Sequence, residues 1–183
     1  MKKITILLTT ALFVAAGFEA NADSYNYRPY VGIDYLFNQT AARKYNPHYN
    51  VAGVRVGSDY SKYFATELFA NQSNRDKRTR EGQDFKTSFY GYGLDILAFL
   101  PICSEDKLFL TATAGIGEYG YKTKLSPTAR RTEHGYGYRF GGGIKYAINE
   151  HWQTRLIGRY IHFDQVSGYK YAAEYSLGVE YHF

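Results

Sequence analysis

The chain has 183 residues with a formal net charge of +5, and aromatic residues make up 18% of it. One domain is the expectation at this length, and the aromatic content excludes a disordered chain. The single Cys excludes a disulfide scaffold or a Cys-rich metal site, and the histidines show no metal-ligand spacing, so no cofactor is expected. Beyond the first twenty residues no stretch is apolar for 18 positions, so no membrane-spanning helix is predicted there.

The N-terminal residues have the pattern of a secretory signal peptide. Lys2 and Lys3 form a short basic region, residues 4–18 are mostly apolar, and the small residues Ala20 and Ala22 frame a cleavage site. The sequence therefore predicts a signal peptide over residues 1–22 and an exported domain over residues 23–183.

The exported part alternates between apolar and polar residues with a period of two. Segments of about ten alternating residues have the length of tilted strands that cross a membrane. The predicted strands are 30–38, 49–58, 64–72, 85–100, 108–121, 135–148, 152–163 and 170–183.

The connections between these segments alternate in length. Those after the first, third and fifth segments (39–48, 73–84 and 122–134) are long and polar, whereas those after the second, fourth and sixth (59–63, 101–107 and 149–151) are short. Long loops at one end and tight turns at the other are typical of barrels that span the outer membrane. The predicted fold is therefore all-β, an eight-stranded antiparallel up-and-down transmembrane β-barrel.

The side chains of each segment indicate which face turns inward. In the last segment Tyr175, Leu177 and Val179 share one face, while Glu174 and Glu180 share the other. A soluble barrel would bury the apolar face, but the interior of an eight-stranded barrel is too narrow for the aromatic rings of that face. Most glycines lie on the charged face, where they relieve crowding on a concave wall. The charged face is therefore predicted to line the lumen and the apolar face to meet lipid.

The charges predicted to face the lumen are balanced, five acidic against five basic. Because an unpaired charge in a narrow, low-dielectric space is costly, these groups are expected to form ion pairs in a largely closed lumen. Arg55 with Glu67 is the best single pair, and Arg155 or Arg159 is expected to meet Glu174 or Glu180. The predicted set is Asp34, Arg55, Glu67, Asp95, Arg139, Lys145, Arg155, Arg159, Glu174 and Glu180.

The chain resembles the small outer-membrane β-barrels of the OmpA/OmpX type and the opacity-type, porin-like proteins. The resemblance rests on the signal peptide, the eight alternating segments, the glycine-rich stretches ATAGIGEYGY and GYGYRFGGGIKYAI, and the aromatic last residue. It implies a Gram-negative outer membrane and a C-terminal signal that the barrel assembly machinery recognises. The residues of that signal would be Tyr175, Leu177, Val179, Tyr181 and Phe183.

The three long connections each carry a net positive charge. Such loops are expected to attract the phosphates of lipopolysaccharide, or an acidic ligand on a host or another cell surface, whereas nucleic acid is not an expected partner of an exported barrel. The basic loop residues are Arg43, Lys44, Arg75, Lys77, Arg78, Arg80, Lys122, Lys124, Arg130 and Arg131.

The favoured function is a structural or surface-interaction role without enzymatic activity. A narrow porin-like channel for water or small ions is the alternative. A lipid A-modifying barrel enzyme is a second alternative, because His48, His134 and either Ser73 or Ser126 could meet at the loop end. A soluble lipocalin-like carrier is a further one, which would leave the barrel outside the membrane.

Overall fold

A computed structural model describes residues 27–42, 48–74, 76–80, 83–102, 107–124, 130–164 and 169–183. The predicted signal peptide lies outside these residues. None of the residues described forms a helix long and apolar enough to cross a membrane. The strands are β1 (Arg28–Ala42), β2 (His48–Ser61), β3 (Phe64–Ser73), β4 (Asp76–Arg80), β5 (Gln83–Pro101), β6 (Leu108–Lys124), β7 (Arg130–Ala147), β8 (Trp152–Phe163) and β9 (Tyr169–His182).

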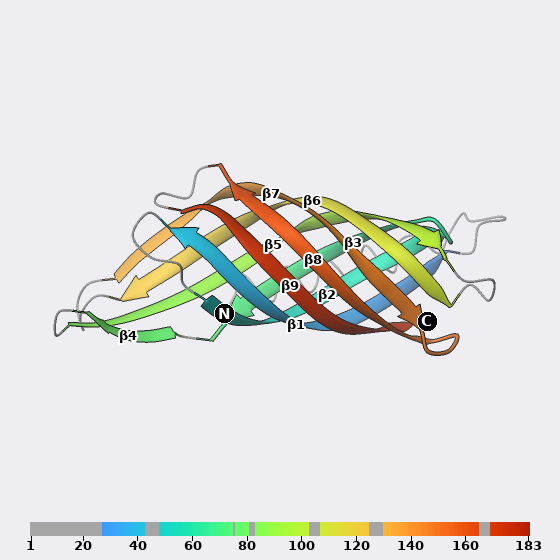
Figure 1. Cartoon of the computed structure of the whole chain (residues 1–183), viewed down its shortest axis with the longest axis horizontal. Coiled ribbons are helices and arrows are strands. Elements are labelled where there is room, and N and C mark those ends of the chain that lie inside the picture. The colour runs from blue at the N-terminus through green and yellow to red at the C-terminus, as the bar shows by residue number, and fades with distance from the viewer. Residues whose placement is uncertain are drawn as a thin grey trace.

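The strands form one antiparallel sheet that closes on itself. Its order is β3-β2-β1-β9-β8-β7-β6-β5-β4, and an additional β3–β5 pairing joins the two sides into an eight-stranded barrel. Figure 1 shows the strands running obliquely around the long axis of the barrel. The predicted eight-stranded antiparallel barrel is therefore confirmed.

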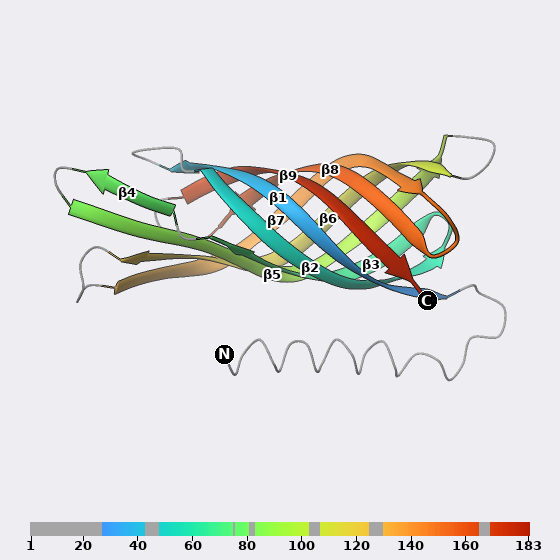
Figure 2. The same cartoon turned by 90° about the horizontal axis from the view of Figure 1, so that it is seen from below.

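The two ends of the barrel differ. The connections β2–β3 and β7–β8 lie at the end where β9 finishes, which we call the turn end, and the opposite end is called the loop end. At the loop end β4 pairs with the first residues of β5 and extends beyond the barrel, as Figure 2 also shows. The segment 73–84, expected to be a loop, thus contains a short strand. The ladder between β6 and β7 also reaches Lys124 and Arg130, so the expected loop 122–134 is partly strand.

The facing of the side chains follows the predicted parity. In β9 Tyr175 and Leu177 are 57% and 58% exposed on the outside, whereas Glu174 and Glu180 are buried inside. The same alternation holds in β1, where Ile33 and Tyr35 are exposed on either side of the half-buried Asp34. An apolar outer surface and a charged interior are the inverse of a soluble barrel, so the lipocalin-like alternative is not supported.

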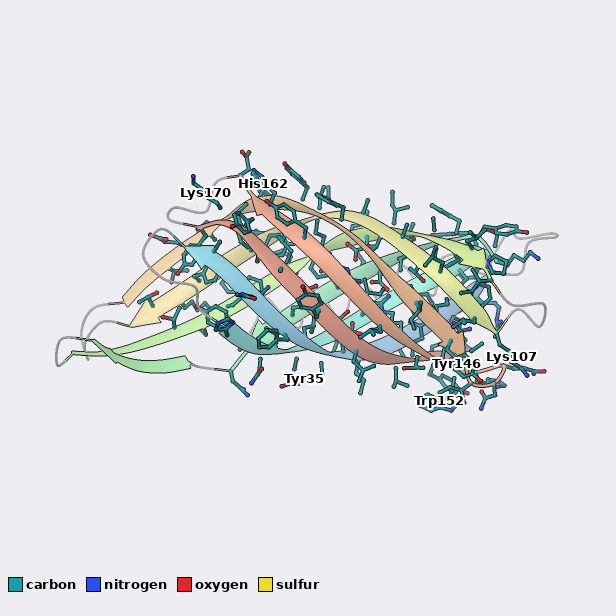
Figure 3. All side chains as sticks on the ribbon, viewed as in Figure 1. Tyr35, Lys107, Tyr146, Trp152, His162 and Lys170 are labelled. Carbon is teal, nitrogen blue, oxygen red and sulfur yellow. The ribbon has the colours of Figure 1, made fainter. Side chains whose placement is uncertain are left out.

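The outer surface is apolar along the barrel. Aromatic side chains lie toward both ends, as expected at the two interfaces of a membrane, but exposed aromatic side chains such as Tyr35 and Tyr175 also lie among the aliphatic residues of the middle. In Figure 3 Tyr146 and Trp152 lie at the turn end, and His162 lies toward the loop end. Exposed aromatic residues toward the turn end are Tyr60, Tyr63, Phe64, Tyr146, Trp152 and Phe183. Those in the loop half include Phe37, Tyr136, Tyr138, Tyr160 and Tyr171. The exposed aliphatic residues between them include Ile33, Val54, Ile96, Ile116, Leu156 and Leu177.

Candidate functional site

The most elaborate side-chain arrangement lies inside the barrel, where guanidinium and carboxylate groups from seven strands meet. We call it the central ion-pair network. Its members are Asp34, Arg55, Glu67, Asp95, Arg139, Arg155, Arg159, Glu174 and Glu180, which lie on β1, β2, β3, β5, β7, β8 and β9.

Arg55 is the first centre of this network. Its guanidinium contacts Asp34 on one neighbouring strand, and its Nη2 lies 2.8 Å from Glu180 Oε2. Its Nε lies 3.6 Å from Glu67 Oε2, so the structure brings together the two residues of the expected best pair. The Arg55 side chain has no exposed surface, so three carboxylates replace the water that would otherwise solvate it.

Glu67 is the second centre, and three arginines surround it. Arg155 donates to both of its carboxylate oxygens, with distances of 2.8 and 2.9 Å, and Arg159 Nη2 lies 3.7 Å away. The Tyr30 hydroxyl also donates to Glu67 Oε2 at 3.0 Å. Because β3 and β8 are separated in the sheet by other strands, the contact between Glu67 and Arg155 crosses the lumen.

The third centre of the network is Arg139 on β7. Arg139 donates to both oxygens of Asp95, at 2.7 and 2.5 Å, and its Nη1 lies 3.5 Å from Glu174 Oε1. Arg159 lies 3.5 Å from both Asp95 and Glu174. Since Arg159 also approaches Glu67, it connects the two halves of the network. The pairing of Arg159 with Glu174 matches one of the expected combinations, whereas Arg155 pairs with Glu67 and Asp34 instead.

A smaller charged group lies toward the turn end. Lys145 Nζ is 3.6 Å from Asp59 Oδ2 and 3.5 Å from Glu180 Oε1, so it joins Asp59 to the central ion-pair network. The His182 ring lies 3.2 Å from Glu180 and 3.6 Å from Asp59, and it is completely buried. Neither Asp59 nor His182 is among the expected lumen pairs. His182 lies on the same face of β9 as Glu180, and this parity points its ring into the lumen.

Glycines provide the space that the arginines occupy. A Cβ atom on Gly32 would lie 2.7 Å from two atoms of the Arg55 guanidinium group. A Cβ on Gly178 would collide with Asp34 Oδ1 and would lie 2.7 Å from Arg55 Nη1. The placement of glycines on the charged face therefore has a direct cause, because this wall of the lumen leaves no volume for a methyl group.

Apolar side chains also fill part of the lumen. The loop-end aromatic cluster consists of buried side chains on the same parity as the charges. Its ring-bearing members include Tyr49, Phe69, Phe89, Tyr119, Tyr121 and Phe163. Tyr121 stacks on Tyr169 with ring centroids 3.8 Å apart, and the Arg139 guanidinium lies 3.3 Å from the centroid of Phe69. A second cluster of Tyr30, Ala65, Leu97, Phe99 and Phe109 occupies the turn end. The lumen therefore holds two apolar clusters in addition to the expected ion pairs.

The basic loop residues are described only in part. Lys122 is exposed on the outer surface, with its Nζ 4.9 Å from the centroid of the Tyr90 ring. The backbones of Lys77, Arg78 and Arg80 lie in β4, and those of Lys124, Arg130 and Arg131 lie at the ends of β6 and β7, but their side chains are outside the description. Arg43, Lys44 and Arg75 lie outside the described residues altogether.

The residues considered for a hydrolytic site lie on different faces. The Ser73 hydroxyl is buried in the lumen, where it accepts a hydrogen bond of 2.7 Å from the Phe89 backbone N–H. The exposed His48 ring stacks on Phe37 of the outer surface, with ring centroids 5.7 Å apart. His134 is exposed, and Ser126 lies outside the described residues. The structure does not bring His48 and Ser73 together.

Known structures share this fold at low sequence identity. Neisserial surface protein A (NspA) has a TM-score of 0.72 and 15% identity, covering 85% of this chain and 97% of its own. Ail, the attachment invasion locus protein of Yersinia pestis, solved with the heparin analogue sucrose octasulfate, has a TM-score of 0.62 and 12% identity over 86% of this chain and 99% of its own. OprG from Pseudomonas aeruginosa has a TM-score of 0.54 and 12% identity, with coverage of 85% and 96%.

Among curated proteins, no sequence is similar enough to match the chain. The family described as "Outer membrane protein beta-barrel domain" matches it over residues 6–183. The closed eight-stranded barrel and its apolar exterior agree with that match. The chain therefore belongs to the outer membrane protein β-barrel family of Gram-negative bacteria.

Proposed function

We propose that this protein is a surface barrel with a closed lumen, whose basic loop end contacts polyanions at the cell surface. The observation that carries the proposal is the filling of the lumen. The central ion-pair network occupies its middle, with the loop-end aromatic cluster above it and a smaller apolar cluster at the turn end. Because the middle of the interior is used for packing, the loops are the part of the molecule that meets a partner at the cell surface.

Closure of the lumen is supported by the burial of the charged side chains in its middle and of the aromatic rings next to them. Glu67, Asp95, Glu174 and the arginines around them have side chains at most 2% exposed. An ion that crossed this layer would have to separate buried pairs at a large electrostatic cost. It would then have to pass the rings of Tyr119 and Tyr121, which are 0% and 1% exposed.

Single-channel recording in planar bilayers tests closure against the porin-like alternative. The folded barrel is expected to give no reproducible openings. Openings whose conductance changes in the Glu67→Gln variant would overturn closure, since they would place the ion path through the network. Openings that are unchanged in Glu67→Gln but disappear when the protein is left out would also contradict a sealed barrel.

The polyanion that we propose is lipopolysaccharide of the outer leaflet. Long loops of outer-membrane barrels lie on the extracellular side, and here each of the three carries a net positive charge. Lys122 is exposed at the outside of the loop end beside Tyr90, where a cation can reach a headgroup phosphate. Ail, which shares the fold, was solved with the heparin analogue sucrose octasulfate, and this supports an anionic ligand as the class of partner.

Binding to purified lipopolysaccharide tests this partner. A variant with Arg43, Lys44, Arg130 and Arg131 changed to Gln is expected to lose most of the salt-dependent binding of the parent. A control changes two basic residues at the turn end, Lys62 and Lys107, to Gln and should bind like the parent. Equal losses in both variants would contradict a loop-specific site. Loss of heparin binding with lipopolysaccharide binding intact would instead assign the loops to a polymer on another cell.

We also propose that the protein is exported and is not an enzyme. Export is supported by the pattern of residues 1–22 and is tested by N-terminal sequencing of the membrane protein, which should begin at Asp23. A non-catalytic role is supported by the separation of Ser73 from His48. Lipid A mass spectra of cells with and without the gene should be identical, and a new acylated or hydrolysed species would refute this.

A further inference from the structure

A cavity of about 450 Å³ opens at the turn end of the barrel. It lies opposite the basic loops and plays no part in the function proposed above. Its volume falls within the range of about 300–1,000 Å³ that is usual for small-ligand sites. The aromatic side chains of Phe99 and Phe109 form part of its lining, with their ring centroids 6.4 Å apart and at a steep angle.

Four side chains that line the cavity are basic and two are acidic. The basic residues are Arg28, Lys62, Lys107 and Lys145. The Lys145 side chain is buried. Its ammonium lies 4.0 Å from the centroid of the Phe99 ring and pairs with Asp59 and Glu180. The excess of positive charge at an opening with aromatic walls favours an organic anion with an apolar body.

Two buried acceptors in the lining have no hydrogen-bond partner among the described residues. Gln153 is only 6% exposed, and its Oε1 atom is buried and unpaired. Asp59 Oδ1 is likewise buried and unpaired, although Asp59 Oδ2 faces Lys145. A buried acceptor without a donor is energetically costly, so a ligand that supplies an N–H or O–H group here is favoured. Because the Lys145 ammonium is close by, a neutral donor fits better than a cationic one.

We propose that this cavity binds a small carboxylate with an adjacent neutral N–H group and an apolar side chain, as in an N-acyl amino acid or the free C-terminus of a peptide. The carboxylate meets the basic residues around Arg28, the amide N–H donates to Gln153, and the apolar side chain packs on Phe99 and Phe109. The site would face the periplasm, since the short turns of outer-membrane barrels lie on that side.

The test titrates the folded full barrel in nanodiscs with N-acetyl-L-phenylalanine and follows backbone amide shifts by NMR. Saturable shifts are expected at the turn end. Gln153→Leu should weaken binding about threefold to tenfold, as for the loss of one hydrogen bond, and Arg28→Gln about tenfold. The matched control is Gln72→Leu, which makes the same change on an exposed residue at the loop end and should leave affinity unchanged.

Two altered probes separate the parts of the proposal. N-acetyl-L-phenylalanine amide lacks the carboxylate and 3-phenylpropionate lacks the N–H, so both should bind more weakly than the parent ligand. The difference between N-acetyl-L-phenylalanine and 3-phenylpropionate should vanish in Gln153→Leu. Absence of saturable shifts with the parent protein would overturn the site. Equal binding of all three probes, or equal effects of Gln153→Leu and Gln72→Leu, would show partition into lipid or micelle and would also overturn it.

Discussion

Arg155 on β8 donates to both carboxylate oxygens of Glu67 on β3, at 2.8 and 2.9 Å, although the two strands are not neighbours in the sheet. The side chains are 2% and 0% exposed. Such a contact holds opposite walls of the barrel together across its axis. It also concentrates charge, because Arg55 and Arg159 approach the same carboxylate.

This arrangement predicts that Glu67→Gln destabilises the barrel by about 3–5 kcal/mol, the usual cost of removing one partner of a buried pair. Three guanidinium groups would lose the charge that compensates them. The free energy of unfolding in urea, measured for the barrel in lipid vesicles, provides the value. The control is Glu150→Gln in the exposed turn after β7, which should change stability by less than about 0.5 kcal/mol. Similar losses at both positions would show that the network does not stabilise the fold.

The glycines beside the network lead to a second prediction. Gly178→Ala places a methyl group against Asp34 and Arg55. Gly158→Ala on the outer surface makes only ordinary van der Waals contacts, at 3.6 Å to the Tyr175 ring and 4.0 Å to the Gly142 carbonyl oxygen. Overpacking of a filled interior costs about 1–3 kcal/mol. Gly178→Ala should therefore unfold at lower urea concentration, and Gly158→Ala should match or exceed the parent because Ala reduces the entropy of the unfolded chain. Equal midpoints for the two variants would contradict the assigned facing of β9.

The strands and their facing could be predicted from the sequence, because a period of two is a local property. In β9 the alternation of Tyr175 and Leu177 with Glu174 and Ser176 suffices to assign the inner face. The extended ladder at the loop end was not predictable in this way, because the residues near Lys124 and Arg130 are polar on both faces.

The pairing of charges was predictable only between neighbouring strands. Arg55 and Glu67 lie on adjacent strands, and Arg159 pairs in register with Glu174, so their proximity follows from the order of the chain. The contact between Arg155 and Glu67 depends on how far the strands are staggered when the sheet closes, which no local pattern specifies. The inward rings of Tyr119 and Tyr121 share the parity of the glycines in β6, and that parity was the available signal.

A third prediction concerns the membrane face. Val54 lies in the middle of β2 and is 51% exposed on the outer surface. Val54→Arg should cost about 2–4 kcal/mol if this position lies near the bilayer midplane. The matched control is Asn50→Arg, which lies on the same face of the same strand but near the loop end, where the cost should be about 0–1 kcal/mol. Unfolding in vesicles measures both, and a larger cost at Asn50 would reverse the proposed depth of the barrel.

The last prediction separates folding from assembly in the cell. Phe183 is 67% exposed. Its backbone N–H donates a hydrogen bond of 3.0 Å to the Pro29 carbonyl, and its ring makes one edge-on contact with Tyr181, with ring centroids 5.4 Å apart. Its side chain therefore contributes little to the stability of the closed barrel. If it is part of a signal read by the assembly machinery, deletion of Phe183 should greatly reduce the protein in the outer membrane, while Phe183→Tyr, which keeps an aromatic ring, should accumulate normally.

Membrane fractionation measures accumulation, and the different gel mobility of heated and unheated samples measures folding. The deletion variant should still refold in detergent, because the ladders that close the barrel end before this residue. Failure to refold in detergent would assign Phe183 a structural role instead. Normal accumulation of the folded deletion variant in cells would exclude the terminal aromatic residue from the assembly signal and would leave Tyr181, Val179, Leu177 and Tyr175 to account for it.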